Sequence, residues 1–162
     1  MITINNKYLF HVILFFFAII AQIYFPIISV VNLQMQPDIC LLYITIIAIL
    51  YGRFFAIIIS FFMGLIQDFS TQAELLGILS FSKSITAYLI GSIYSYKTIW
   101  GKEIQYAVIF ISYTVHFFLY FYLFSRTIFD LYYLSIFIIS HSVIVLILFL
   151  LCNNLVFKNK LL

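Results

Sequence analysis

Charged residues are scarce in this chain: Asp, Glu, Lys and Arg together make up 8% of its 162 residues, whereas 66% are hydrophobic. A soluble domain is about one-quarter charged and about half apolar. So few polar groups leave no surface that water can wet, so the composition excludes a water-soluble globular protein and predicts an integral membrane protein. At about 20 residues per crossing helix, the length allows one domain of several spans and no separate extramembrane domain.

Cysteine is equally scarce, and no enzyme motif is present. The two thiols, Cys40 and Cys152, lie far apart in the chain, which argues against a metal site or a disulfide framework. The sequence contains no Walker loop, no HExxH and no GxSxG, so we expect no enzyme activity and no cofactor. The basic residues are scattered along the chain, which argues against a nucleic-acid surface. The first apolar run lacks an A-x-A cleavage site and is interpreted as a retained helix.

Apolar residues instead form six continuous runs, which favour helices over the alternating strands of a barrel. Only Gly52-Arg53 interrupts the second and third runs, which together span 33 residues. One straight helix of that length would reach about 50 Å, far beyond the ~30 Å of membrane hydrocarbon, so a hairpin is predicted here. The six expected helices are 8–28, 37–51, 53–69, 74–95, 103–124 and 131–157.

The distribution of charge predicts the orientation in the membrane. If both termini face the cytoplasm, one basic residue, Arg126, falls outside, and most of the acids lie near the outer face. This asymmetry is the positive-inside pattern of multi-pass membrane proteins. The predicted cytoplasmic basic residues are Lys7, Arg53, Lys97, Lys102, Lys158 and Lys160, and the predicted outer acids are Asp38, Asp68, Glu74 and Asp130.

Two charges, Asp68 and Lys83, fall within the apolar runs, where an unpaired charge is costly. With 1.5 Å of rise per residue, Asp68 stands about 22 Å above Arg53 and Lys83 about 14 Å below the outer end of the next helix. Both therefore lie in the outer half of the membrane, and we predict that they form a buried ion pair. Asp38, directly after Pro37, faces the same layer and suits the positive end of its helix dipole. This polar layer is either a structural ion pair or a substrate or partner site.

Small side chains recur at four-residue spacing on the two helices that carry these charges. Such stripes allow helix backbones to approach closely in lipid. Facing stripes would also enclose the predicted ion pair inside the bundle. The stripes are Gly52, Ala56, Ser60, Gly64 and Asp68 on one helix, and Lys83, Ala87 and Gly91 on the next.

Two histidines, His116 and His141, are placed in the middle of the last two spans, at depths that differ by about 5 Å. No carboxylate or cysteine is expected beside them, so they make a poor metal site and lack the partners of a catalytic triad. We therefore interpret them as hydrogen-bonding groups between helices.

An ordered set of motifs lies between residues 37 and 91, a little over a third of the chain: Pro37-Asp38, Tyr51-Gly52-Arg53, Gly64-Leu65-Ile66-Gln67-Asp68, Leu76-Gly77, and Lys83, Tyr88 and Gly91. They resemble those of MreD, a family of bacterial rod shape-determining membrane proteins, in order and spacing. The expected size, span number and orientation also fit that family, although the high Ile and Phe content departs from its Leu- and Ala-rich members.

The resemblance implies a non-enzymatic component of the cell-elongation machinery in a bacterial inner membrane. Such proteins are thought to associate with MreC, and through it with MreB, RodA and the transpeptidase partner of RodA. The candidate structural or partner-site residues are Pro37, Asp38, Gly52, Arg53, Gly64, Asp68, Gly77, Lys83, Ala87 and Gly91.

The MreD family is also similar in fold to the S components of energy-coupling factor transporters. These proteins bind a vitamin from outside the cell and pass it to an ATPase module, and they supply the alternative function. The outer connection SVVNLQMQP carries almost no polar ligand groups, which favours the MreD-like interpretation.

Overall fold

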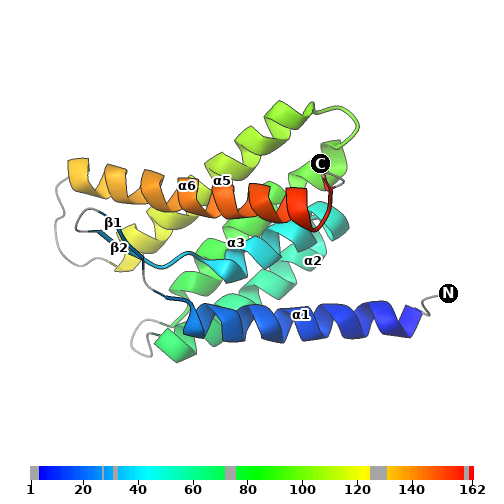
Figure 1. The fold of residues 1–162 in the computed structure, drawn as a ribbon, viewed down its shortest axis with the longest axis horizontal. Helices are drawn as coiled ribbons and strands as arrows, with labels where there is room; N and C mark the ends of the chain where they lie inside the picture. The colour runs from blue at the N-terminus through cyan, green and yellow to red at the C-terminus, as the bar shows by residue number, and fades with distance from the viewer. Residues whose placement is uncertain (1–3, 27, 31–32, 72–75, 125–130, 159–160) are drawn as a thin grey trace.

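A computed structural model describes the chain except for residues 1–3, 27, 31–32, 72–75, 125–130 and 159–160, and for some further residues it describes the backbone alone. Helices dominate the described part and pack side by side as a bundle (Figure 1). Glu74, Arg126, Asp130 and Lys160, used above to predict the orientation, lie outside the described residues. The elements are α1 (Ile4–Tyr24), β1 (Ile28–Val30), β2 (Leu33–Met35), α2 (Ile39–Thr71), α3 (Ile78–Ile90), α4 (Ser92–Tyr96), α5 (Lys102–Phe124) and α6 (Leu131–Leu155).

The end of the first helix differs from the prediction. α1 was expected to reach Ile28, but it ends at Tyr24. Pro26 explains the difference, because the residue before a proline is disfavoured in helical conformation. The following segment, expected to be a plain connection, forms a short antiparallel hairpin in which Ile28 pairs with Met35 and Val30 with Leu33.

The predicted break at Gly52 is present, and the chain reverses direction there. Gly52 has φ 78° and ψ −174°, a conformation that is essentially restricted to glycine. The reversal also follows from Lys83, whose Nζ contacts both Asp38 and Gln67. A straight helix would place those two residues about 43 Å apart. α2 therefore consists of an outgoing half (residues 39–51) and a return half (residues 53–71).

The return half of α2 packs antiparallel against α3 through the predicted small residues. A Cβ added to Gly64 would lie 2.5 Å from the Cα of Ser80, and one added to Gly91 would lie 2.7 Å from the Cα of Arg53. Backbone therefore meets backbone at both ends of this helix pair, as expected for small-residue stripes in lipid. Ala56, Ser60 and Ala87, also in the stripes, are fully buried.

Replacing Gly64 with alanine is expected to lower the free energy of unfolding by about 1–3 kcal/mol, the usual cost of overpacking. The added methyl group would collide with the backbone of Ser80, so the two helices must separate. Gly101→Ala is the matched control, because no atom lies within 4 Å of its added Cβ. Unfolding in detergent micelles measures both variants, and equal stability of the two would contradict the close approach.

The two ends of the bundle differ in charge. Both chain termini lie at the same end (Figure 1). Arg53 and Gly91 meet at that end, where the Lys97 Nζ also donates to the backbone oxygen of Leu161 at 2.6 Å. The side chains of Asp38 and Asp68 lie at the opposite end, beside the N-termini of the outgoing half of α2 and of α3.

Helix length and apolarity support a membrane location. Within the described residues, three helical segments are long and apolar enough to cross a membrane, and the first contains the reversal at Gly52. Large apolar side chains such as Phe17, Phe54 and Tyr122 are exposed on the outside of the bundle. The three segments are Ile39–Ser70, Lys102–Leu123 and Tyr132–Leu155.

Candidate functional site

A buried ion pair joins α3 to the start of α2. The Lys83 Nζ lies 2.8 Å from Oδ2 of Asp38 and 2.9 Å from its Oδ1, and it also donates to Oε1 of Gln67. The side chain of Lys83 is 0% exposed and that of Asp38 is 8% exposed. Lys83 therefore connects both halves of α2 to α3, in a site where a lone charge would be strongly destabilising.

Asp68 forms a second buried charge centre, at the N-terminus of α3. Its carboxylate accepts backbone N–H bonds from Gly77 at 3.0 Å, Leu79 at 3.1 Å and Ser80 at 3.3 Å. The Ser80 hydroxyl donates a fourth bond, at 3.2 Å. The first N–H groups of a helix lack partners within it and carry the positive end of its dipole. Asp68 thus caps α3 across the helix pair.

The predicted Asp68–Lys83 ion pair is therefore wrong. The depth argument placed both residues at the same end of the bundle, and they do lie there. Depth alone, however, does not determine which partner each charge selects. The N–H groups of the first turn of α3 occupy Asp68, while Lys83 lies further along α3 and reaches Asp38.

Asp38 and Gln22 together cap the N-terminus of α2. Oδ1 of Asp38 accepts the N–H of Leu41 at 2.8 Å, the usual geometry of an aspartate N-cap. The Gln22 Oε1 accepts the N–H of Ile39 at 2.6 Å and that of Cys40 at 3.4 Å. The expected placement of Asp38 at the positive end of this helix is thus confirmed. Gln22 of α1 adds a second cap at the same helix end.

The charges at this end of the bundle come close to balancing one another. Asp38 and Asp68 contribute two negative charges and Lys83 one positive charge. Each acid lies at a helix N-terminus, which is equivalent to roughly half a positive elementary charge. With uncharged histidines, the cluster of Asp38, Asp68 and Lys83 is therefore nearly neutral, which explains how three ionisable side chains are buried together.

The two histidines lie near this cluster, but they do not hydrogen-bond to each other. Nε2 of His116 is 3.5 Å from Oδ2 of Asp38, so a carboxylate does lie beside it, contrary to the expectation above. Nδ1 of His116 is buried and has no hydrogen-bond partner among the described residues. Nδ1 of His141 is 3.0 Å from the backbone oxygen of Phe137, one turn earlier on the same helix. Nδ1 of His141 therefore makes its contact within α6, and it does not form the predicted hydrogen bond between helices.

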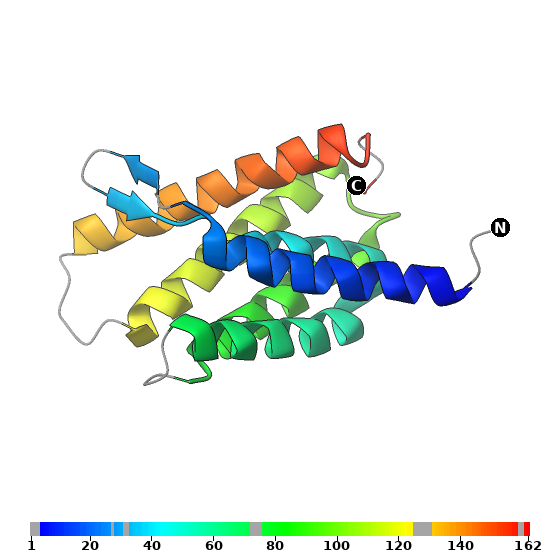
Figure 2. The ribbon, with the colours of Figure 1, turned by 60° about the horizontal axis from the view of Figure 1, so that its bottom comes forward.

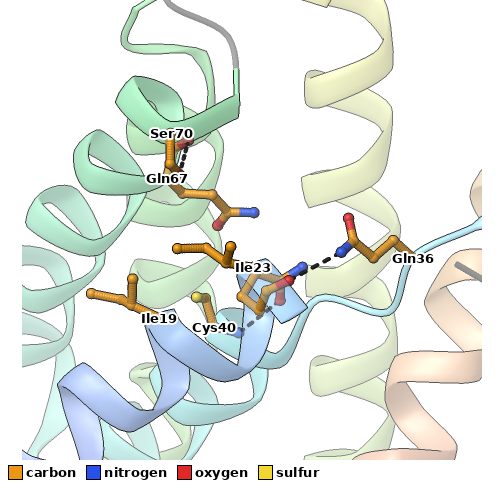
Figure 3. Close-up of a pocket in the computed structure, with 7 residues that line it drawn as sticks. Ile19, Ile23, Gln36, Cys40, Gln67 and Ser70 are labelled. Atoms are coloured by element: carbon orange, nitrogen blue, oxygen red, sulfur yellow. Dashed lines mark hydrogen bonds between the residues drawn. The ribbon is translucent and has the colours of Figure 1, made fainter. Parts of the chain in front are cut away.

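Among the described residues, two cavities adjoin the cluster. The inner chamber, of about 280 Å³, is named for its place between the polar cluster and an aromatic wall on α5 and α6, and it is itself partly open to the surface. The outer cleft, of about 190 Å³, lies between α1 and the return half of α2 (Figure 3). Gln22, Gln36 and Gln67 line both spaces. The other residues of the inner chamber are Asp38, Leu79, His116, Phe117, Tyr120, Phe121, Phe137 and His141, and those of the outer cleft are Ile19, Ile23, Cys40 and Ser70.

The ten candidate residues from the sequence divide between the two ends of the bundle. Pro37, Asp38, Gly64, Asp68, Gly77 and Lys83 belong to the polar end. Gly52, Arg53 and Gly91 lie at the opposite end, and buried Ala87 is one turn of α3 from Gly91. There the Arg53 guanidinium lies 4.7 Å from the centre of the Tyr88 ring, within the range of a cation–π interaction. The second group thus supports the turn at Gly52 rather than the polar site.

Four residues of the polar end were missed as site residues by the sequence prediction: Gln22, Gln36, Gln67 and His116, which lies beside the Asp38 carboxylate. Gln36 belongs to the connection SVVNLQMQP, so the expectation that this connection carries almost no polar ligand groups is wrong. Gln22 carries a usable signal, since it is a carboxamide in the apolar part of α1 that follows His11. Gln67 directly precedes Asp68 in the sequence and was quoted in a motif, but no charge drew attention to it. The contact between His116 and Asp38 joins residues 78 positions apart, so no local pattern reveals it.

Within the described residues, no group of three or more His, Cys, Asp or Glu side chains is arranged to hold a metal ion. Both cysteines are free thiols, with Cys40 buried and Cys152 partly buried. In comparisons with known proteins, no protein-family model, no curated protein and no solved structure matches this chain.

Proposed function

We propose that this chain is a multi-pass scaffold of the bacterial cell-elongation machinery, similar to MreD and located in the inner membrane. It would act without catalysis, by binding an MreC-like protein and, through it, MreB, RodA and the transpeptidase partner of RodA. The observation that carries the proposal is that the MreD-like motifs between residues 37 and 91 all belong to one packed unit, formed by α2 and α3. Gly64, Asp68 and the Asp38–Lys83 pair hold this unit together.

The same proposal includes six crossings with both termini in the cytoplasm. The two halves of α2 would cross separately, and α3 with α4 would form the fourth crossing, as in the S-component fold. Support comes from the location of Arg53 and Lys97 at the end that holds the termini and of Asp38 and Asp68 at the other end. This arrangement agrees with the positive-inside pattern.

Depletion of the protein from a rod-shaped host is expected to produce round cells, because the elongation machinery would lose its membrane scaffold. Microscopy during depletion measures the ratio of cell length to width. Re-expression of the natural chain should restore rods, and the affinity-tagged chain should co-purify an MreC-like protein from detergent extracts. Cells that remain rods, together with a pull-down without an MreC-like protein, would contradict the scaffold function.

A second candidate is an S component of a vitamin transporter, and the inner chamber favours it. A chamber lined by carboxamides, histidines and aromatic rings has the mixed polar and apolar character of small-molecule sites. For this candidate, depletion would abolish the uptake of one vitamin and leave cell shape unchanged. The tagged chain would then co-purify an ATPase module instead of an MreC-like protein.

A further inference from the structure

The inner chamber and the outer cleft share three residues, Gln22, Gln36 and Gln67. These glutamines come from α1, from the segment before α2 and from the return half of α2. Figure 3 shows the side chain of Gln67 opposite Ile19 and Ile23, on the far side of the space next to α1. The two spaces therefore adjoin, with carboxamide groups at the boundary between them.

The outer cleft is positioned to open toward lipid. Figure 2 shows α1 crossing the front of the bundle, with the return half of α2 below it. Ile19 and Ile23 line the α1 side of the cleft, and Ile23 is 54% exposed on the outer surface of the helix. An exposed apolar residue at the mouth makes this cleft suitable for a hydrocarbon chain rather than for a water-soluble molecule.

The inner chamber suits a small hydroxylated group. Its volume of about 280 Å³ corresponds to roughly nine water molecules at about 30 Å³ each, and lies at the lower limit for ligand pockets. Carboxamides, and imidazoles in their uncharged form, present both donors and acceptors, which matches hydroxyl groups that also do both. On the opposite wall, the rings of Phe121 and Phe137 pack edge to face, with their centres 4.5 Å apart, and provide an apolar surface for C–H groups.

The charge of the chamber disfavours an ionic ligand group. Asp38 is already paired with Lys83, and the cluster with Asp68 is nearly neutral when both histidines are uncharged, so an additional ion would lack a fixed counter-charge. By contrast, His116, whose ring also interacts with the backbone of Ser82, lines the chamber with a buried Nδ1 that makes no well-formed hydrogen bond among the described residues. A neutral hydroxyl group can satisfy such an atom without adding charge.

The geometry points to a binding site for an amphipathic molecule with an uncharged, hydroxylated head group. The head occupies the inner chamber against Gln67 and His116, and the hydrocarbon part leaves between Ile23 and the return half of α2 into the lipid. This inference does not depend on the proposed scaffold function, because binding is measured on the purified protein and scaffolding in cells.

Ser70 is exposed and lines the outer cleft, so a thiol at this position reports on the cleft, whereas the Cys40 thiol is 0% exposed and poorly placed to react. In a Cys40→Ser/Ser70→Cys/Cys152→Ser background the thiol at position 70 is the only one, and its reaction with N-ethylmaleimide can be followed by intact mass. The protein is held in dodecyldimethylamine N-oxide, a detergent whose head group has no hydroxyl. Monoolein, an uncharged glycerol lipid, is expected to slow the reaction about tenfold at about ten times its Kd. Glycerol alone and oleate are expected to give no protection at the same concentration.

Two pairs of variants localise the effect. Gln67→Met keeps the size of the side chain but removes its hydrogen bonds, and is expected to abolish the protection by monoolein. Gln105→Met is the matched control, since Gln105 lines neither cavity and bonds to Trp100 at the other end of the bundle. Ile23→Trp is expected to block the mouth, whereas Ile20→Trp is its control, with the same 54% exposure on the same helix but outside the cleft.

Native mass spectrometry supplies a second readout that needs no thiol chemistry. One retained monoolein is expected on the natural chain, Gln105→Met and Ile20→Trp, and none on Gln67→Met or Ile23→Trp. Absence of retained monoolein on the natural chain overturns the proposal. Equal binding of oleate overturns the uncharged head group, and equal protection by glycerol overturns the amphipathic ligand in favour of a water-soluble one.

Discussion

Replacement of Lys83 by methionine is expected to lower the free energy of unfolding by about 3–5 kcal/mol, the usual cost of removing one partner from a buried ion pair. Methionine fills nearly the same space, so the loss reports charge rather than packing. Without the ammonium group, Asp38 remains buried with a carboxylate that has lost two contacts, at 2.8 and 2.9 Å. Unfolding by denaturant in detergent micelles, followed by circular dichroism, measures the change.

A double-mutant cycle identifies the partner of Lys83. Asp38→Asn removes the negative charge and retains an oxygen that can accept the N–H of Leu41. The Asp38→Asn/Lys83→Met double variant is therefore expected to be more stable than Lys83→Met alone. The cycle with Asp68→Asn should show a much smaller coupling, because Asp68 bonds to Gly77, Leu79 and Ser80 instead. A stronger coupling of Lys83 to Asp68 than to Asp38 would refute the arrangement.

The helices and the turn at Gly52 were predictable because their causes are local. Continuous apolar runs required helices, and a run of 33 residues broken by Gly52-Arg53 was too long for one straight crossing. The small stripes predicted the close approach of Gly64 to α3 in the same way, since their four-residue spacing follows from helix geometry. In contrast, the end of α1 at Tyr24 depended on a single proline within an apolar run.

The partners within the polar site were not predictable, because they depend on how helices are rotated about their axes. Residue spacing gives depth along a helix, and it correctly placed Asp38, Asp68 and Lys83 at one end. It does not show that free N–H groups at the start of α3 compete with Lys83 for Asp68. Nor does it show that Gln22 of α1 reaches the first turn of α2, which requires the packing of a third helix.

Replacement of Asp68 by alanine is also expected to cost about 3–5 kcal/mol. The carboxylate accepts four hydrogen bonds at the N-terminus of α3, and each buried N–H group that is left without an acceptor costs about 1–3 kcal/mol. Alanine leaves the buried N–H groups of Leu79 and Ser80 without acceptors. Asp68→Asn retains one acceptor oxygen, so its free energy of unfolding should fall by about half as much. In Ser80→Ala the free energy of unfolding should fall by only about 1 kcal/mol.

Hydrogen exchange distinguishes the loss of this cap from general destabilisation. In Asp68→Ala, the amides of Gly77, Leu79 and Ser80 should exchange much faster, while those in the middle of α5 remain protected. The cap explains how a 13-residue helix begins with its first N–H groups satisfied by a side chain from the return half of α2. Uniformly faster exchange along α3 and α5 would instead indicate that Asp68 stabilises the whole bundle and not the start of α3.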